Sequence, residues 1–306
     1  MAHGGLMRWS LLSLMISACS EADVIPDDPQ NVEPFTLVAI PDIQYMTLGQ
    51  SPVFEGMTSF IREQSAARNV RFVMQEGDIS HNNTDAEFAF ALDGFDVLRD
   101  TVDYAVCVGN HDMDGRETSV FNRHFGDSYY VRQDSYDSQR QVDKVDDHVH
   151  TFEVDGVKWL VLSLVYDPQP DTIAWADGVL LAHPEHRTIV LTHAYLLPNG
   201  ARSSIGDRIW DGVVAHHPQV TMVLNGHYTA GEAARQVSVG DAGNAVHELF
   251  VNFQDRPLGG MGLARFMEID PAAGTISVQT LFTLSTGELD DEANLFVLDD
   301  VELGAL

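Results

Sequence analysis

Cysteine, basic residues and long apolar runs are all scarce in this sequence. Only two of the 306 residues are cysteines, so a framework of disulfides is not expected. Lys and Arg number 17 against 46 Asp and Glu, which gives a net charge of −29. This balance argues against an extended nucleic-acid surface, which needs basic residues to neutralise phosphates. A phosphate-bearing substrate stays open, because bound metal cations dominate the field of their own site.

The apolar run near the N-terminus, Trp9–Ile16, is too short to cross a bilayer. It follows a short stretch with one basic residue and runs into Ile16-Ser17-Ala18-Cys19. This order resembles a bacterial lipobox, so residues 1–19 are predicted to be a lipoprotein-type signal segment. An ordinary cleaved signal with a stray cysteine is the alternative, and either one exports the protein. We therefore expect an exported bacterial cell-envelope protein, lipid-anchored through Cys19 on the periplasmic or outer-membrane face.

The rest of the chain divides into a short tether and one folded domain. Residues 20–34 are rich in acidic residues and proline, as flexible linkers are. Over residues 35–306 strand and helix patterns alternate without an internal repeat, which predicts one α/β domain with a mostly parallel sheet. A hairpin turning at Asp155-Gly156 makes the sheet mixed. The polar stretch Gln133–Asp147 is predicted to be a surface loop. The expected helices are Phe54–Arg68, Asp85–Arg99, Thr172–Ala182 and Ile205–Ala215; the expected later strands are Ala245–Asn252, Leu263–Ile269 and Thr275–Leu281.

Five polar blocks each follow directly after an apolar, strand-like run. Strands that end in this way deliver side chains to the crevice outside a sheet edge, where ligands of α/β proteins bind. Two aspartates, an asparagine and histidines, with no thiolate, suit Zn, Mn, Fe, Ni or Co better than an iron–sulfur cluster or Cu(I). The five blocks are Pro41-Asp42-Ile43-Gln44, Gly77-Asp78, Gly109-Asn110-His111-Asp112, Thr192-His193 and Asn225-Gly226-His227, after Phe35–Ile40, Val70–Met74, Tyr104–Val108, Thr188–Leu191 and Val220–Leu224.

In this order the five blocks resemble the calcineurin-like metallophosphoesterases, whose pattern is D-x-H, G-D, G-N-H-[DE], a lone His and G-H-x-H. The resemblance runs over Phe35–Thr229. It implies a four-layer α/β/β/α sandwich with mixed central sheets. The opening Pro-Asp-x-Gln-Tyr resembles an exported bacterial branch, whose later strands tend to carry a Gln and a Gly-rich turn. Here these are Val251-Asn252-Phe253-Gln254 and Gly259-Gly260.

The resemblance also implies two divalent metal ions, drawn from Mn, Zn, Fe, Ni, Co or Mg. Asp78 would bridge both ions and Asp42 would hold the first. The second ion would be completed by Asn110, His193 and His227.

The implied activity is hydrolysis of a small phosphomonoester or phosphodiester by in-line attack of metal-bound hydroxide. His111 would face the scissile phosphate, where it stabilises the transition state or protonates the leaving group. Asp112 would orient that imidazole through its other ring nitrogen.

Two positions depart from the family pattern, and both belong to the first ion. Gln44 stands in place of one histidine and Thr229 in place of the last. An amide carbonyl is a weaker donor than imidazole, and a hydroxyl is poorer still. The departures leave open a harder ion (Mg, Mn or Ca) bound by Gln44, a ligand from elsewhere such as His81, or a mononuclear enzyme. A surface protein that binds metal but has lost hydrolysis is the alternative function.

Several other residues carry weaker signals. Cys107 lies inside a strand-like run and is expected to be a buried, inert thiol. Arg202 and Arg235 flank the last two blocks, where they either bind substrate phosphate or form structural ion pairs. The remaining histidines lack a strand-end position, and most are expected at the surface. These are His148, His150, His183, His186, His216 and His217.

Overall fold

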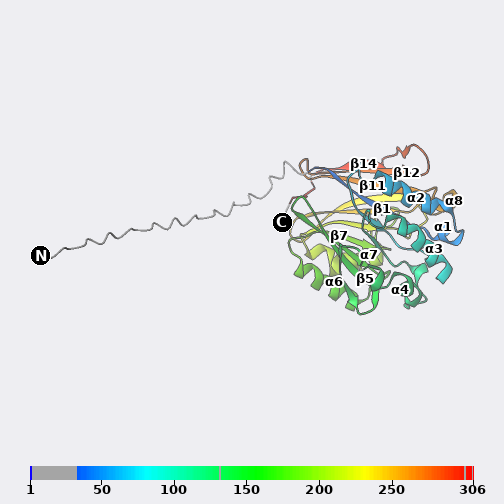
Figure 1. Cartoon of the computed structure of the whole chain (residues 1–306), viewed down its shortest axis with the longest axis horizontal. Helices are drawn as coiled ribbons and strands as arrows, with labels where there is room; N and C mark the ends of the chain where they lie inside the picture. The colour runs from blue at the N-terminus through cyan, green and yellow to red at the C-terminus, as the bar shows by residue number, and fades with distance from the viewer. Residues whose placement is uncertain (2–32, 131, 300, 305) are drawn as a thin grey trace.

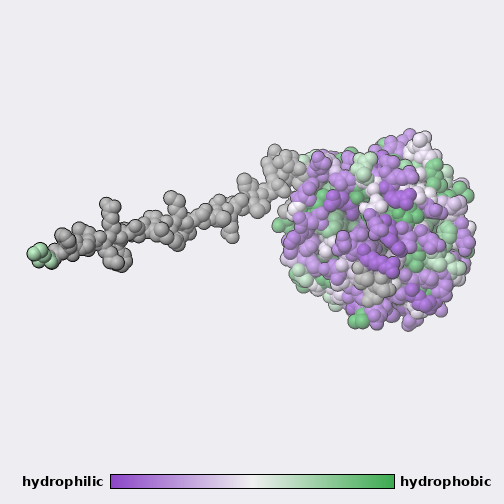
Figure 2. Space-filling view, in the orientation of Figure 1, coloured by the Kyte–Doolittle hydropathy of each residue, from purple (hydrophilic) through white to green (hydrophobic). Residues whose placement is uncertain are grey.

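The structure is a computed structural model that describes Met1 and residues 33–130, 132–299, 301–304 and 306. Apart from Met1, the predicted signal segment with Cys19 lies outside the described residues, as do residues 20–32 of the predicted tether. Export and lipid anchoring therefore stay predictions. Within the described part, no helix is both long and apolar enough to span a membrane. The face seen in Figure 2 is mainly hydrophilic with scattered apolar residues.

The first sheet brings the start of the domain beside its end (Figure 1). β1 (Phe35–Ile40) pairs in parallel with β2 (Val70–Gln75), and β2 with β3 (Tyr104–Val106). On its other side β1 pairs antiparallel with β11 (Leu263–Asp270). The carboxyl ends of β1, β2 and β3 therefore meet at one edge. The order is β13-β12-β11-β1-β2-β3, with β14 also on β12; the remaining strands are β12 (Thr275–Phe282), β13 (Glu288–Leu289) and β14 (Leu295–Leu298).

The second sheet has a parallel centre. β6 (Val157–Leu164), β7 (Arg187–Thr192), β8 (Val220–Asn225) and β10 (Ala245–Val251) run side by side in this order. The hairpin between β5 and β6 is confirmed, because Asp155-Gly156 forms its turn with φ of 48 and 82. The full order is β4-β5-β6-β7-β8-β10-β9; the remaining strands are β4 (Tyr136–Gln141), β5 (Lys144–Val154) and β9 (Ala233–Val239).

Three apolar cores join the layers and confirm the four-layer α/β/β/α sandwich. On β1, Val38 packs toward helices α2 (Pro52–Gln64) and α3 (Asp85–Phe95), whereas Leu37 packs between the two sheets. This alternation follows from the two-residue period of a strand that is buried on both faces. Helices α6 and α7 cover the second sheet. The further helical segments are α1 (Gln44–Leu48), η2 (Asp96–Leu98), η3 (Asn110–Asp112), α4 (Ser119–Phe125), α5 (Asp127–Tyr130), α6 (Pro170–Ala182), α7 (Ser204–Gly212), η4 (Val214–His216) and α8 (Pro257–Gly260).

The prediction of a surface loop over residues 133–147 is wrong. It contains β4, and β5 begins at Lys144. β4 is an edge strand with both faces partly exposed, so its polar sequence shows no alternation. The prediction that the nearby histidines lie at the surface is also wrong, since His148 and His150 on β5 are 0% exposed. By contrast, Cys107 is buried as expected, and its thiol donates to the carbonyl of Leu164 at 3.1 Å.

Candidate metal centre

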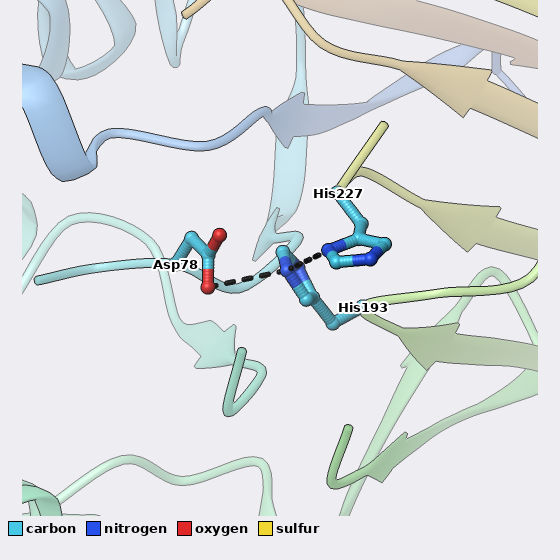
Figure 3. Close-up of side chains that lie close together, drawn as sticks. All are labelled: Asp78, His193 and His227. Atoms are coloured by element: carbon cyan, nitrogen blue, oxygen red, sulfur yellow. Dashed lines mark hydrogen bonds and ion pairs between the residues drawn. The ribbon is translucent and has the colours of Figure 1, made fainter. Parts of the chain in front are cut away.

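The five blocks come from both sheets and not from a single sheet edge. The first three follow β1, β2 and β3 of the first sheet, and the last two follow β7 and β8 of the second. Because the two sheets face each other, their carboxyl edges bring the blocks together. Figure 3 shows Asp78, His193 and His227 pointing toward one another across this junction.

His193 is the centre of the convergence. Its Nε2 lies 3.2 Å from Asp78 Oδ1 and 3.2 Å from Asn110 Oδ1. The same nitrogen is 3.1 Å from His227 Nδ1. On the other side of the ring, Nδ1 donates to the Glu76 carbonyl at 2.8 Å, so Nε2 is the ring nitrogen that faces the site. The ligand atoms of Asp78, His193 and His227 all lie within 4.8 Å of one another, which fits a single cation.

The electrostatics of the site show a need for positive charge. Burial lowers the pKa of His193, but Asp78 and Asp42 outweigh it and raise that pKa to about 10. Burial and the neighbouring His193 lower the pKa of His227 to about 4. The imidazolium form of His193 is thus favoured beside Asp78, whereas the neutral form of His227 is favoured. A divalent cation would meet the same demand, so the donor set fits the metal that the sequence implies.

Two of the candidate ligands have left-handed backbone conformations. Asp78 has φ of 50 and His227 has φ of 76, which is uncommon outside glycine. Such conformations concentrate at functional sites, where the surrounding structure enforces them. The carboxylate of Asp78 helps to stabilise its left-handed conformation, because Oδ1 accepts the backbone N–H of His111 at 2.9 Å.

Glycines of the blocks make room for ligands of other blocks. A side chain at Gly226 would collide with Asp42 Oδ1, and one at Gly109 would collide with the Asp78 carboxylate. Gly77 has φ of +96 and packs on the His193 ring. The glycines therefore set how closely the sheet edges approach.

The position expected for the first ion, beside Asp42, is lined by amide groups. Asp42 accepts the backbone N–H of His227 at 3.2 Å on each oxygen. Gln44 aims its Nε2 at Asp78 Oδ2, 3.3 Å away, and its Oε1 lies 2.8 Å from His81 Nδ1. In this orientation Gln44 acts as a donor to Asp78, so ligation through its carbonyl requires rotation of the amide. Thr229 is exposed.

The structure corrects the role expected of Asp112. Its carboxylate accepts the backbone N–H groups of Gly109, Ile79 and Ser80, at 2.9, 3.1 and 2.7 Å. Its Oδ1 also accepts the Ser80 hydroxyl at 3.0 Å. These bonds fix the loop that carries Asp78. The imidazole of His111 is instead oriented by the carbonyl of His81, 2.8 Å from Nδ1.

His111 and Asn110 line a hollow of 540 Å³ beside the centre. His81 shares this lining and stacks on His111 with ring centroids 5.0 Å apart. His81 is not part of the group formed by Asp78, His193 and His227; it lies beside Gln44, so its role as a ligand of the first ion stays a prediction. The hollow gives a substrate group access to His111 and to the edge of the metal centre.

The two flanking arginines are structural. Arg202 pairs with the buried Glu248, its Nε 3.0 Å from Oε2, and stacks on Trp210. Arg235 donates to the Glu292 carbonyl and lies over Phe296. Neither arginine lines the hollow.

Sequence reasoning assigned no role in the site to Asn252 and Gln254. Asn252 Nδ2 donates to Asp42 Oδ2 at 2.8 Å, and Gln254 Oε1 accepts from Gln44 Nε2 at 2.6 Å. The signal was present, because both residues follow the apolar strand β10, as the five blocks follow theirs.

The fold is that of the metallophosphoesterases, and the donor set fits a metal ion. The model of the calcineurin-like phosphoesterase family matches residues 35–229, and the chain belongs to this family. A curated relative, the uncharacterized protein YvnB of Bacillus subtilis (strain 168), is 29% identical over 273 residues. That match covers 85% of this chain but 21% of the relative, so the chain spans about a fifth of the relative's length.

Solved structures show the same fold. Purple acid phosphatase PPD1 from yellow lupin (Lupinus luteus) seeds matches with a TM-score of 0.55 and 11% identity, over 89% of this chain and 55% of that one. A dimetal phosphatase from Danio rerio matches with a TM-score of 0.53 and 14% identity, over 84% of this chain and 98% of that one. At these identities the likeness concerns the fold alone.

Proposed function

We propose that this chain hydrolyses a small phosphomonoester or phosphodiester with the help of two divalent cations. The observation that carries the proposal is the convergence of Asp78, Asn110, His193 and His227 beside a hollow that His111 lines. Asp78, Asn110, His193 and His227 would hold one ion, and Asp42 with Asp78 the other. When bound, such ions lower the pKa of water toward neutrality and offset the charge that develops on phosphorus oxygens.

The proton chemistry falls to His111. Its Nδ1–H donates to the His81 carbonyl, which leaves Nε2 free for the substrate. In the imidazolium form Nε2 can give a proton to the leaving oxygen, and in either form the ring position is fixed. Asp112 supports this arrangement indirectly, since it holds the loop of Asp78 and the turn at Gly109.

The test is hydrolysis of p-nitrophenyl phosphate and bis(p-nitrophenyl) phosphate by the purified full chain loaded with Mn²⁺ or Zn²⁺. We expect turnover of one or both esters. His111→Ala is expected to lower kcat about 10²–10⁴-fold with bound metal retained, because it removes a general acid. Asp78→Asn is expected to lower both activity and metal content.

His216→Ala serves as the matched control, because His216 is exposed and its hydrogen-bond partners are Asp241 and the Asp211 carbonyl, which belong to none of the five blocks. It is expected to keep wild-type kcat. Absence of turnover with every divalent ion, in a chain that still binds metal, contradicts hydrolysis. That result favours the non-hydrolytic metal-binding protein.

A further inference from the structure

A sixth polar block reaches the metal centre from β10. This strand pairs in parallel with β8, so its carboxyl end lies next to the block that carries His227. The chain continues from β10 into Asn252 and Gln254, which are 3% and 5% exposed. Both residues lie beyond the range of 35–229 that the family model matches.

Asn252 holds the carboxylate of Asp42. Its Nδ2 donates to Asp42 Oδ2 at 2.8 Å, while its Oδ1 accepts the backbone N–H of Gln254 at 3.0 Å. The two contacts fix which end of the amide faces the aspartate. Asn252 is therefore a positioning residue for Asp42, and its carbonyl is turned toward the chain of its own loop.

Gln254 presents its carbonyl oxygen to the same region. Gln254 Oε1 and Asp78 Oδ2 both approach Gln44 Nε2, at 2.6 and 3.3 Å. A buried carboxylate oxygen and a buried amide oxygen thus converge on one electropositive point. The amide N–H₂ of Gln44 occupies the place where a cation would take the same two oxygens.

Gln44 and His81 can adapt to such a cation. In the structure, His81 Nδ1 lies 2.8 Å from Gln44 Oε1. Rotation of the Gln44 amide turns Oε1 toward Asp78 and brings Nε2 to face His81 Nδ1 instead. Imidazole accepts at Nδ1 when its proton sits on Nε2, so the contact with His81 survives the rotation. Gln44 then adds a third oxygen to the first position.

We propose that Gln254 is a ligand of the first cation position, together with Asp42, Asp78 and Gln44. The side chain takes the place that the exposed Thr229 leaves empty. All four donors are oxygens, so the position selects a hard divalent cation such as Mn²⁺ or Mg²⁺. The neighbouring position keeps the two imidazoles of His193 and His227. The proposal rests on the two-ion centre of the proposed function.

The experiment counts Mn²⁺ per chain. The full chain is stripped with a chelator, titrated with Mn²⁺ and followed by electron paramagnetic resonance and elemental analysis. Wild type is expected to bind two ions with a spin-coupled signal at saturation. Gln254→Leu is expected to retain the ion held by His193 and His227 and to lose the coupled signal. Its affinity for Mn²⁺ at the first cation position is expected to fall by at least ~10-fold.

Three further variants sharpen the result. Gln254→Glu keeps an oxygen in place and is expected to bind two ions. His193→Ala is expected to lose the ion that Gln254→Leu retains. Gln219→Leu is the matched control, since Gln219 is 3% exposed and donates to the Leu180 carbonyl at the opposite end of β8. It is expected to keep both ions.

Three outcomes overturn the proposal: wild type that binds a single Mn²⁺, Gln254→Leu that binds two with wild-type affinity, or Gln254→Leu that loses both. Circular dichroism and thermal unfolding compare folding of Gln254→Leu with that of Gln219→Leu. Metal counting needs no turnover, so failure of this proposal is distinguishable from failure of the proposed hydrolysis.

Discussion

At the scale of single residues, the glycines of the five blocks make room for side chains that belong to other blocks. Gly226 makes room for the carboxylate of Asp42, and Gly109 for that of Asp78. Gly226 and Gly109 need no unusual backbone angle, because neither is among the residues with positive φ. Their requirement for glycine is steric. The glycine in a pattern such as G-N-H or G-H thus indicates that two strands of the sandwich approach closely at that point.

This packing leads to a prediction for Gly226→Ala. The added methyl group collides with Asp42 Oδ1, so either the carboxylate moves or the strand end shifts. We expect a loss of about 1–3 kcal/mol in the free energy of unfolding, typical of overpacking, and at least a ~10-fold weaker Mn²⁺ affinity. Denaturant unfolding and Mn²⁺ titration measure these changes.

Gly178→Ala is the control for that substitution. Nothing lies within 4 Å of a methyl group at Gly178, which sits inside α6. Alanine favours a helix interior, so this variant is expected to be as stable as wild type or more stable. Equal behaviour of the two variants would show that Gly226 does not limit the approach of Asp42.

At the scale of elements, the sequence predicted most of the framework. Each of the five strand-like runs is a strand, and the four expected helices appear with shifted ends. Buried parallel strands read as continuous apolar runs, which makes them easy to recognise. The positions of Asp78 and His193 followed from the same runs, because a strand end fixes where the next residue goes.

Other features had no comparable signal. β4 is polar on both faces, so nothing in its sequence separates it from a loop. The hydrogen bonds of Asp112 depend on the fold of its own turn and of the loop at Ile79, which residue types do not reveal. Gln254 lies 210 residues from Gln44, and only the parallel pairing of β10 with β8 brings it near.

The buried histidines of β5 lead to a prediction about acid stability. Burial lowers the pKa of His148 to about 4, against 6.5 for a free imidazole. The ring packs on Tyr130 at 4.9 Å and on His150 at 5.3 Å, and burial with His148 also lowers the pKa of His150. The unfolded chain therefore takes up protons at a higher pH than the folded chain does.

The stabilising contribution of neutral His148 is fully present above pH 6.5 and is lost as the pH falls toward 4. We expect the free energy of unfolding to fall by on the order of 3 kcal/mol over this range from His148 alone. His148→Gln keeps a donor for the Val145 carbonyl without titrating, so its unfolding free energy should fall less. Urea unfolding between pH 7 and 4 measures the difference. A fall in His148→Gln as large as that of wild type would contradict it.

At the scale of the whole molecule, charge opposes the proposed substrate. A net charge of −29 surrounds a site that is expected to bind an anionic ester. Repulsion of this kind acts over ~30 Å at 10 mM salt and over ~8 Å at 150 mM. Bound cations favour the ester only once it is near.

We therefore expect kcat/KM for p-nitrophenyl phosphate to rise several-fold between ~10 and ~150 mM NaCl, because screening speeds encounter. The bis ester carries less charge, so its rise should be smaller. Steady-state kinetics at matched Mn²⁺ concentration measure both slopes. A fall in kcat/KM for both esters as salt increases would contradict a repulsive field.

The pairing of β1 with β11 has a consequence for biosynthesis. β1 precedes every other strand that the structure describes, yet one of its two neighbours in the sheet spans residues 263–270. The closure entropy of so long a loop is met before the contact forms, which makes pairing of this kind slow. The first sheet therefore stays incomplete until β11 has been translated. During that interval one edge of β1 is an open template for another strand, so we expect nascent copies of this chain to be prone to intermolecular strand pairing.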